Sequence, residues 1–422
     1  MERRSSLRGS QQRYSGGTVR RHKPDHWLLI IASVLMVVGL VVIYSISPGL
    51  SASQNVSQSY FISKQLLGIF LAAAAFAVAA YLPLSLWSKS AKWLASAAII
   101  GSVAVMLIPT DTVYQAHRWI RLGGFSFQIA ELIKLAILIG LAGFLARQAK
   151  IGKLADLNST LKPLIILLAV IGLVVAKLQS DLGSAGVMIA MMVVMAYVAG
   201  LPLKKAAMIS GLVVILLILT VSFSDYRRER LANFFHPQSN CLTTGYQACQ
   251  ALISVGSGGA LGLGLGYSVQ AYGYLPEASN DSIFAIIAEK FGFIGTLSIM
   301  VIYGALITRL KRIAERTIDL TQRLVVVGVM TWLSVQMIIN VGAMTGLLPL
   351  KGITLPLISQ GGTSMIFLAV ALGIVFQISR YTSYSVVDLK TEINEKPVPN
   401  HSSDGGRLRR AHNPAYVTRP RA

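Results

Sequence analysis

Apolar residues gather in long runs along this chain, and short polar segments separate them. A helix needs about 20 apolar residues to cross the hydrocarbon core of a membrane. Runs of about that length lie at residues 27–47, 61–82, 92–108, 130–146, 161–178, 183–200, 206–223, 282–307, 323–344 and 357–378. This pattern predicts an all-α polytopic membrane protein with about ten transmembrane helices. Only QSDL separates the fifth run from the sixth, a spacing compatible with tilted or partly re-entrant helices.

The composition supports the same fold class. The chain has 422 residues, of which 54% are hydrophobic and only 13% are charged. A water-soluble domain needs more polar side chains than this to cover its surface. The protein is therefore expected in the cytoplasmic (inner) membrane as a multi-pass protein.

Lysine and arginine indicate the orientation, because positively charged short loops stay in the cytoplasm. With the N-terminus inside, 28 of the 38 lysines and arginines fall in cytoplasmic segments. Both termini are thus predicted to be cytoplasmic. Residues 1–26 and 381–422 are basic and lack apolar periodicity, which predicts disordered tails on either side of a membrane domain at 27–380. The net charge of +21 is then explained by cytoplasmic segments that are attracted to anionic membrane lipid. No nucleic acid partner is expected.

The longest extracytoplasmic segment is predicted at residues 224–281. It is too polar to span a membrane and too rich in apolar residues and glycine to be a plain linker, which favours a functional loop. Its two cysteines, Cys241 and Cys249, leave open whether a disulfide forms. Its run GSGGALGLGLG fits neither phosphate-binding glycine pattern, so a flexible or closely packed backbone turn is favoured over a backbone approached by a ligand.

Several charges lie where the topology gives no reason for them. Glu131 and Lys134 are three residues apart inside a predicted span, where they can neutralise each other on one helix face. Asp181 suits a helix N-cap and a functional site equally well. Lys351 is the single charge of another exterior segment. Charge at membrane depth is costly and is usually paired or functional.

The stretch YLPEASND carries two acids, Glu277 and Asp281, at the entrance of a predicted span. A helix starting near Ser279 would explain one acid, because the positive end of the helix dipole favours negative charge. Two acids beside surplus exterior arginines favour a site for an anionic substrate that bears hydroxyl groups. Arginine and lysine bind phosphate, and a partly desolvated carboxylate can accept a hydroxyl proton.

Taken together, these segments resemble the FtsW/RodA family of shape, elongation, division and sporulation proteins, which are polytopic glycosyltransferases of bacterial cell-wall synthesis. The resemblance covers about residues 27–380 and leans toward the division member. The matching segments are HRWIRLGGFSFQIAELIK, QSDLGSA, the loop from YRRERLANFFHP to GYSVQ, YLPEASNDSIFAIIAEKFGFIG and NVGAMTGLLPLKGITLPLISQGGTS.

The resemblance implies that Asp281 is the general base in the polymerisation of lipid II, an undecaprenyl-pyrophosphate disaccharide-pentapeptide, into β-1,4-linked glycan with inversion. It also implies substrate-binding roles for residues on several exterior segments, namely Glu277, Arg118, Glu131, Lys134, Gln179, Asp181, Arg230, Lys351 and Ser359. A divalent cation, Mg²⁺ or Mn²⁺, is compatible with the pyrophosphate, although no ligand cluster demands one. The expected partners are a class B penicillin-binding protein (a transpeptidase) and other division proteins at the septum.

The chain departs from the family pattern beside several of these residues. Gln128-Ile129-Ala130-Glu131 stands where the family usually has Gln-Pro-Ser-Glu, and Ser279-Asn280-Asp281 stands where it usually has His-Thr-Asp. Five charged residues of the motifs are retained, so activity is expected while details of the substrate cavity differ: Glu131, Asp181, Glu277, Asp281 and Lys351.

Two alternatives remain open at this point. One is a flippase for the lipid-linked precursor, with Glu131, Lys134 and Glu289 along a translocation path. The other is a non-enzymatic division scaffold that positions the transpeptidase.

Overall fold

The structure, a computed structural model, describes residues 23–107, 119–122, 125–222, 225–236 and 241–381. Most of both predicted tails lies outside these residues, as does Arg118.

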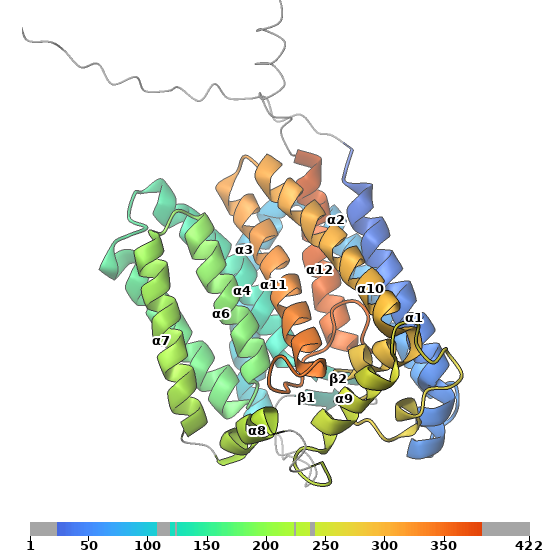
Figure 1. The fold of residues 1–422 in the computed structure, drawn as a ribbon. Helices are drawn as coiled ribbons and strands as arrows, with labels where there is room; N and C mark the ends of the chain where they lie inside the picture. Colours follow the sequence, from blue (N-terminus) through green and yellow to red (C-terminus); the bar gives the residue numbers. More distant parts are fainter. Residues whose placement is uncertain (1–22, 108–118, 123–124, 223–224, 237–240, 382–422) are drawn as a thin grey trace, which may run out of the picture. The chain divides into compact units, whose positions relative to one another are not determined.

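A helix occupies each of the ten predicted runs (Figure 1). These helices are α1 (His26–Gln54), α2 (Tyr60–Tyr81), α3 (Leu84–Leu107), α4 (Ile129–Lys150), a continuous helix made of η1 (Leu157–Leu161), α5 (Lys162–Val170) and η2 (Ile171–Leu178), α6 (Leu182–Val198), α7 (Leu203–Ser222), α10 (Ile283–Arg316), α11 (Leu320–Met344) and α12 (Gly362–Ile378). In the described part of the chain, eight helices are long and apolar enough to cross a membrane, whereas α6 has only 17 residues. The helical polytopic fold class is confirmed, while the count of ten spans and the orientation stay predictions.

The two strands and the elements of the predicted long loop lie together at one end of the bundle (Figure 1). Strands β1 (Trp119–Leu122) and β2 (Phe125–Gln128) form an antiparallel pair in which Trp119 faces Gln128. The predicted long loop contains α8 (Asp225–Phe235), α9 (Tyr246–Ser257) and the short 3₁₀ helix η4 (Gln270–Tyr272). A second 3₁₀ turn, η5 (Ser379–Tyr381), follows α12 at the opposite end.

Helix α11 lies inside the bundle and packs against α4, α6, α10 and α12. Its Trp332 is fully buried. Helix α12 packs closely along α2, where a Cβ on Gly373 would lie 2.6 Å from the carbonyl oxygen of Phe76. Small residues permit such close approach between membrane helices, in which lipid supplies no hydrophobic drive for association.

Two helices begin away from their predicted positions. Helix α3 starts at Leu84, well before residue 92, because the hydroxyls of Ser88 and Ser90 each donate to a carbonyl three residues back and do not interrupt the helix. Helix α12 starts only at Gly362, although the apolar run begins at Leu357. Leu357 has a left-handed φ of 63° and cannot continue a right-handed helix.

The glycine-rich run packs against a break in α10. Gly292 interrupts that helix with φ 63° and ψ −164°. Residues 259–264 restore the lost hydrogen bonds: the N–H groups of Leu263 and Gly264 donate to the carbonyls of Glu289 and Lys290, and the N–H of Phe293 donates to the carbonyl of Gly259. A Cβ on Gly262 would lie 2.2 Å from the carbonyl oxygen of Lys290. The prediction of a closely packed backbone turn is therefore confirmed.

The substitution Gly262→Ala should destabilise the protein by about 1 kcal/mol or more, because Gly262 has a left-handed φ of 83° as well as this close contact. Thermal unfolding of the purified protein in detergent measures the effect. Gly256→Ala is the matched control: nothing lies within 4 Å of its added Cβ, and the residue is helical. The control should gain up to about 1 kcal/mol from helix propensity. Equal melting temperatures for the two variants would contradict the assignment.

Candidate active site

Two chain segments meet helix α11 at the start of α10. The amide nitrogen Nδ2 of Asn340 on α11 donates to the carbonyl of Asp281 at 2.6 Å and to the carbonyl of Ile353 at 2.7 Å. Ile353 belongs to the segment that joins α11 to α12, residues 345–361, which we call the α11–α12 segment. Asn340 is fully buried, and Asp281 is half-buried. The backbone of Asp281 is thus fixed from α11.

Asp281 lies before α10 and not within its first turn. The helix begins at Ile283, two residues after Asp281 and later than the start near Ser279 that the helix-dipole argument required. The preceding residues form a turn instead, since Glu277 has a φ of 53° and its carbonyl accepts from the N–H groups of Asn280 and Ser282. The helix dipole alone therefore does not account for this carboxylate.

Glu277 and Ser359 hold this turn from opposite sides. Nδ2 of Asn280 donates to Oε2 of Glu277 at 2.6 Å, and the Ser359 hydroxyl donates to the carbonyl of Asn280 at the same distance. Ser359 is buried and also accepts from the N–H of Leu355, whereas Glu277 is exposed. Asn280, one of the departures from the family pattern, is therefore the residue that links the two.

The predicted pair between Glu131 and Lys134 is present and buried. Nζ of Lys134 lies 2.7 Å from Oε1 of Glu131, with exposed fractions of 1% and 3% for the two side chains. The same ammonium donates to Oε1 of Gln336 at 3.1 Å and stands 4.8 Å from the centroid of the Trp332 ring. An ion pair in a low-dielectric interior needs such further contacts to offset the loss of hydration.

Asp181 both caps α6 and contacts the end of β2. Its Oδ1 accepts from the N–H of Ser184 at 2.9 Å, and its Oδ2 accepts from Nε2 of Gln128, the residue just before α4, at 3.1 Å. The N-cap role is therefore confirmed, together with a contact to the residue that precedes α4. Lys351 lies nearby, since its Cβ would be 3.6 Å from a Cβ placed on Gly183.

The other predicted site residues are placed less closely together. Nε2 of Gln179 donates to the hydroxyl of Ser102 on α3 at 3.4 Å. Arg230 belongs to α8, but its side chain lies outside the described residues, as does all of Arg118. Within the described residues, no group of three or more His, Cys, Asp or Glu side chains could hold a metal ion.

Glu289 supports the large loop. Its Oε2 accepts from the hydroxyls of Ser254 and Ser268, and its Oε1 accepts from the N–H groups of Val269 and Gln270. The carboxylate is 1% exposed and anchors the polypeptide after the glycine-rich run. Its hydrogen bonds therefore give it a structural role.

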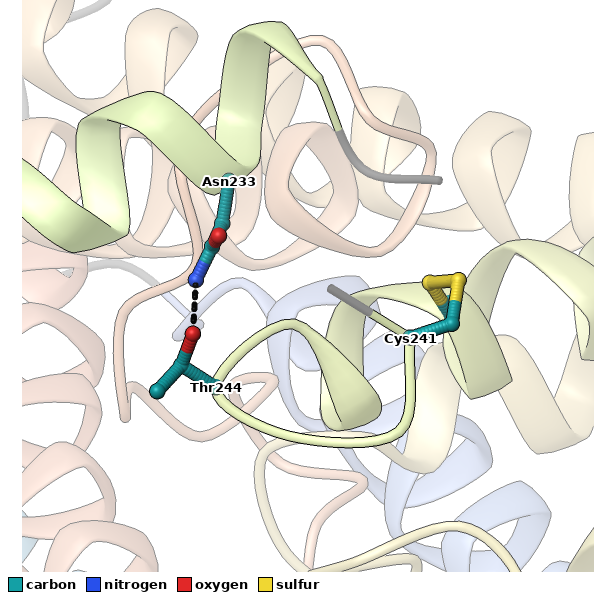
Figure 2. The surroundings of a disulfide bond; sticks show 4 residues. Asn233, Cys241 and Thr244 are labelled. Atoms are coloured by element: carbon teal, nitrogen blue, oxygen red, sulfur yellow. Dashed lines mark hydrogen bonds between the residues drawn. A yellow bond between two sulfur atoms is a disulfide. The ribbon is translucent and has the colours of Figure 1, made fainter. Parts of the chain in front are cut away.

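A disulfide closes a small ring in the same loop. Figure 2 shows the bond between Cys241 and Cys249, whose Cα atoms are 5.5 Å apart. Beside it, Nδ2 of Asn233 on α8 donates to the hydroxyl of Thr244 at 3.0 Å. The question that the sequence left open is answered. The disulfide ties the segment before α9 to α9 itself, and the bond from Asn233 ties α8 to the same segment.

Comparison with known proteins identifies the family. The model of the FtsW/RodA/SpoVE family, described as "Cell cycle protein", matches residues 25–384. The chain belongs to this family. The family resemblance that the sequence motifs indicated is thus confirmed, and the match covers the whole predicted membrane domain of this chain.

Two curated relatives illustrate the similarity. "Probable peptidoglycan glycosyltransferase FtsW" of Thioalkalivibrio sp. (strain K90mix) is 35% identical over 364 residues, which cover 85% of this chain and 90% of the relative. "Stage V sporulation protein E" of Bacillus subtilis (strain 168) is 33% identical over 371 residues, 87% of this chain and 100% of the relative.

Solved structures share the fold. A chain from a structure of "a peptidoglycan synthase complex" superposes with a TM-score of 0.68 at 26% identity, covering 85% of this chain and 99% of that one. The rod shape determining protein RodA of Thermus thermophilus gives a TM-score of 0.62 at 23% identity, with coverages of 86% and 98%. The second comparison supports the fold alone.

Sequence reasoning missed three residues of α11 that the structure brings into the site. Trp332, Gln336 and Asn340 are spaced four apart and are buried on one helix face. The indole N–H of Trp332 donates to Oε1 of Gln336 at 2.8 Å. The two amides at helical spacing inside an apolar run were the available signal, because polar groups within a membrane span face protein and are bonded there.

The substitution Lys134→Met should cost about 3–5 kcal/mol of stability, because it leaves Glu131 charged and buried without its cation. The double variant Glu131→Gln/Lys134→Met removes both charges and should recover most of that loss. Denaturant or thermal unfolding in detergent measures the stability of the wild type, the single variant and the double variant, which are compared as in a double-mutant cycle. Lys204→Met, at an exposed lysine, is the control and should change stability by less than about 0.5 kcal/mol. A double variant no more stable than the single one would refute the ion-pair account.

Proposed function

We propose that this protein is a peptidoglycan glycosyltransferase that polymerises lipid II on the outer face of the cytoplasmic membrane. Family membership and relatives named peptidoglycan glycosyltransferase support the activity. The observation that carries the assignment of the site is the position of Asp281. It is a half-buried carboxylate at the entrance of a membrane helix, and its backbone is fixed by a buried amide of another helix.

The proposed reaction is a single displacement with inversion. The carboxylate of Asp281 takes the proton of the acceptor sugar's 4-hydroxyl, whose oxygen then bonds to the anomeric carbon of the donor sugar. The bond from that carbon to the lipid pyrophosphate breaks, and the electron pair leaves with the pyrophosphate. An α-linked donor thereby gives a β-1,4 bond without a covalent intermediate on the enzyme.

The leaving pyrophosphate requires positive charge near it. We assign this role to Lys351, which lies beside the start of α6, and to Arg118 and Arg230 from the exterior segments. Lys134 has a different role: its ammonium is engaged by Glu131 and Gln336, so it positions α4 against α11. Asp181, Gln128 and Gln179 brace the neighbouring helix ends.

The cellular role proposed here is septal cell-wall synthesis with a class B penicillin-binding protein as partner. Its support is the naming of relatives as FtsW and the match to a chain of "a peptidoglycan synthase complex". In that setting the glycan strands made by this protein would pass directly to a transpeptidase.

Asp281→Asn should lower the rate of glycan synthesis by about 10²–10⁴-fold, the usual contribution of a general base. The assay follows labelled lipid II with the purified full-length protein and its partner transpeptidase. Glu315→Gln, an exposed acid paired with Lys311 far from the site, is the charge-matched control and should retain the wild-type rate. Wild-type polymerisation by Asp281→Asn would rule out this base. Movement of lipid II across vesicles without polymer would favour the flippase, and wild-type growth of cells carrying Asp281→Asn would favour the scaffold.

Asn340→Leu should reduce the turnover number by up to about a hundredfold with little change in the Michaelis constant, because the variant releases the backbone of Asp281 and misplaces the base. Thr331→Val on the same helix is the control, since its buried hydroxyl bonds only the carbonyl of Val327 in its own helix. Steady-state kinetics with lipid II separates the two constants. A rise in the Michaelis constant at an unchanged turnover number would place Asn340 in substrate binding instead.

A further inference from the structure

A cavity lies at the other end of the bundle from Asp281. It has a volume of about 370 Å³ and opens between the end of α2, the start of α3, the start of α11 and the end of α12. Figure 1 shows the end of α12 on the side opposite β1 and β2. The topology predicted from lysine and arginine places this end in the cytoplasm. The lining residues used below are Tyr81, Leu84, Ser85, Gln322, Gln377 and Arg380.

Two of the lining side chains hold polar atoms that have no hydrogen-bond partner among the described residues. Gln377 is 6% exposed, and its Oε1 is buried without a partner in that part of the chain. Nε of Arg380 is also buried and has no partner within the described part of residues 23–381, although the guanidinium carbon stands 5.6 Å from the ring centroid of Tyr81 and 5.5 Å from that of Phe376. Buried polar groups are nearly always bonded, so each exception calls for an explanation. An anionic oxygen in the cavity would accept from Nε of Arg380, whereas Oε1 of Gln377 is itself an acceptor and would take a hydroxyl donor from the same ligand.

The chemistry of the lining favours an anion. A guanidinium held against aromatic rings presents its N–H donors in the planar arrangement that binds phosphate oxygens. The amides of Gln322 and Gln377 and the hydroxyl of Ser85 add further donors, and the cavity has no acidic residue among its described lining. Leu84 and Ser85 are the first two residues of the 24-residue helix α3, whose free N–H groups and dipole also favour negative charge.

The surroundings identify the carrier of that anion as a lipid. The cavity lies where α2 and α12 end and α3 and α11 begin, and large side chains beside it are exposed: Tyr81 by 76%, Leu82 by 37% and Leu86 by 46%. Tyrosine and arginine gather at this depth, where the lipid head groups lie. We propose that this cavity binds the phosphate of an anionic phospholipid from the cytoplasmic leaflet, with Arg380 as the main contact and Gln377 as the second.

The test measures lipid binding by native mass spectrometry of the full-length protein in detergent, titrated with phosphatidylglycerol or phosphatidylcholine. Arg380→Gln should weaken binding of the first phosphatidylglycerol about tenfold, the usual effect of losing one charge-assisted hydrogen bond. Phosphatidylcholine binding should change little. Arg312→Gln is the matched control, because Arg312 is an exposed arginine at the same end of the bundle on α10. Equal affinity of Arg380→Gln and wild type, or an equal loss in the control, would overturn the proposal.

A second variant keeps the test independent of folding. Gln377→Glu places a carboxylate in the same cavity as Arg380, where it can satisfy the guanidinium, so the melting temperature should be retained while phosphatidylglycerol binding is lost. Retained binding by this variant would contradict the proposal. Inorganic phosphate added at millimolar concentration decides the source of the anion. Undiminished lipid binding supports the lipid, whereas displacement of the lipid by phosphate would overturn that part of the proposal.

Discussion

Irregular backbone inside a membrane-embedded bundle must find its hydrogen bonds in protein, because lipid offers none. The α11–α12 segment meets this requirement through side chains of three helices, α2, α10 and α11. Asn340 donates to the carbonyl of Ile353 and Gln336 to that of Thr354, while Tyr303 bonds Pro356 and Gln65 bonds Ile358. Helix α1 can pack closely against the α11–α12 segment only because Gly39 has no side chain. A Cβ at that position would lie 2.4 Å from the carbonyl oxygen of Ile358. The end of the bundle that holds Asp281 is organised around this segment.

The same amides connect the charged groups of the site. The Oε1 atom of Gln336 accepts from Lys134 and Trp332, and its Nε2 atom donates to the α11–α12 segment. One turn further along α11, Asn340 fixes the backbone of Asp281. Helix α11 therefore holds both the buried ion pair on α4 and the backbone of the proposed base before α10. None of these charged residues belongs to α11 itself. Rigid support of this kind is what a proton-transfer site requires, because small displacements of a base reduce its rate steeply.

The sequence allowed the helical layout and the charged residues to be predicted, because both leave a local signal. The apolar runs located ten helices, and the motif around Asp281 located the proposed base. What could not be predicted depends on distant contacts. Leu357 continues an apolar run, yet its positive φ keeps it out of the helix, so α12 begins five residues after the predicted start. Gln336 and Asn340 resemble any polar residue in a span until the carbonyls they bond are known.

The break in α10 turns a surface loop into a segment of fixed length. Residues 259–264 and the two halves of α10 exchange backbone hydrogen bonds at several successive positions, as neighbouring strands of a sheet do. A loop that merely covers a surface tolerates insertions. Here one inserted residue would move every one of these bonds out of register, and the glycines that permit the close approach would no longer face the carbonyls of Ala288 and Lys290. Insertions and deletions should therefore be tolerated less well in residues 259–264 than in loops that make no such hydrogen bonds.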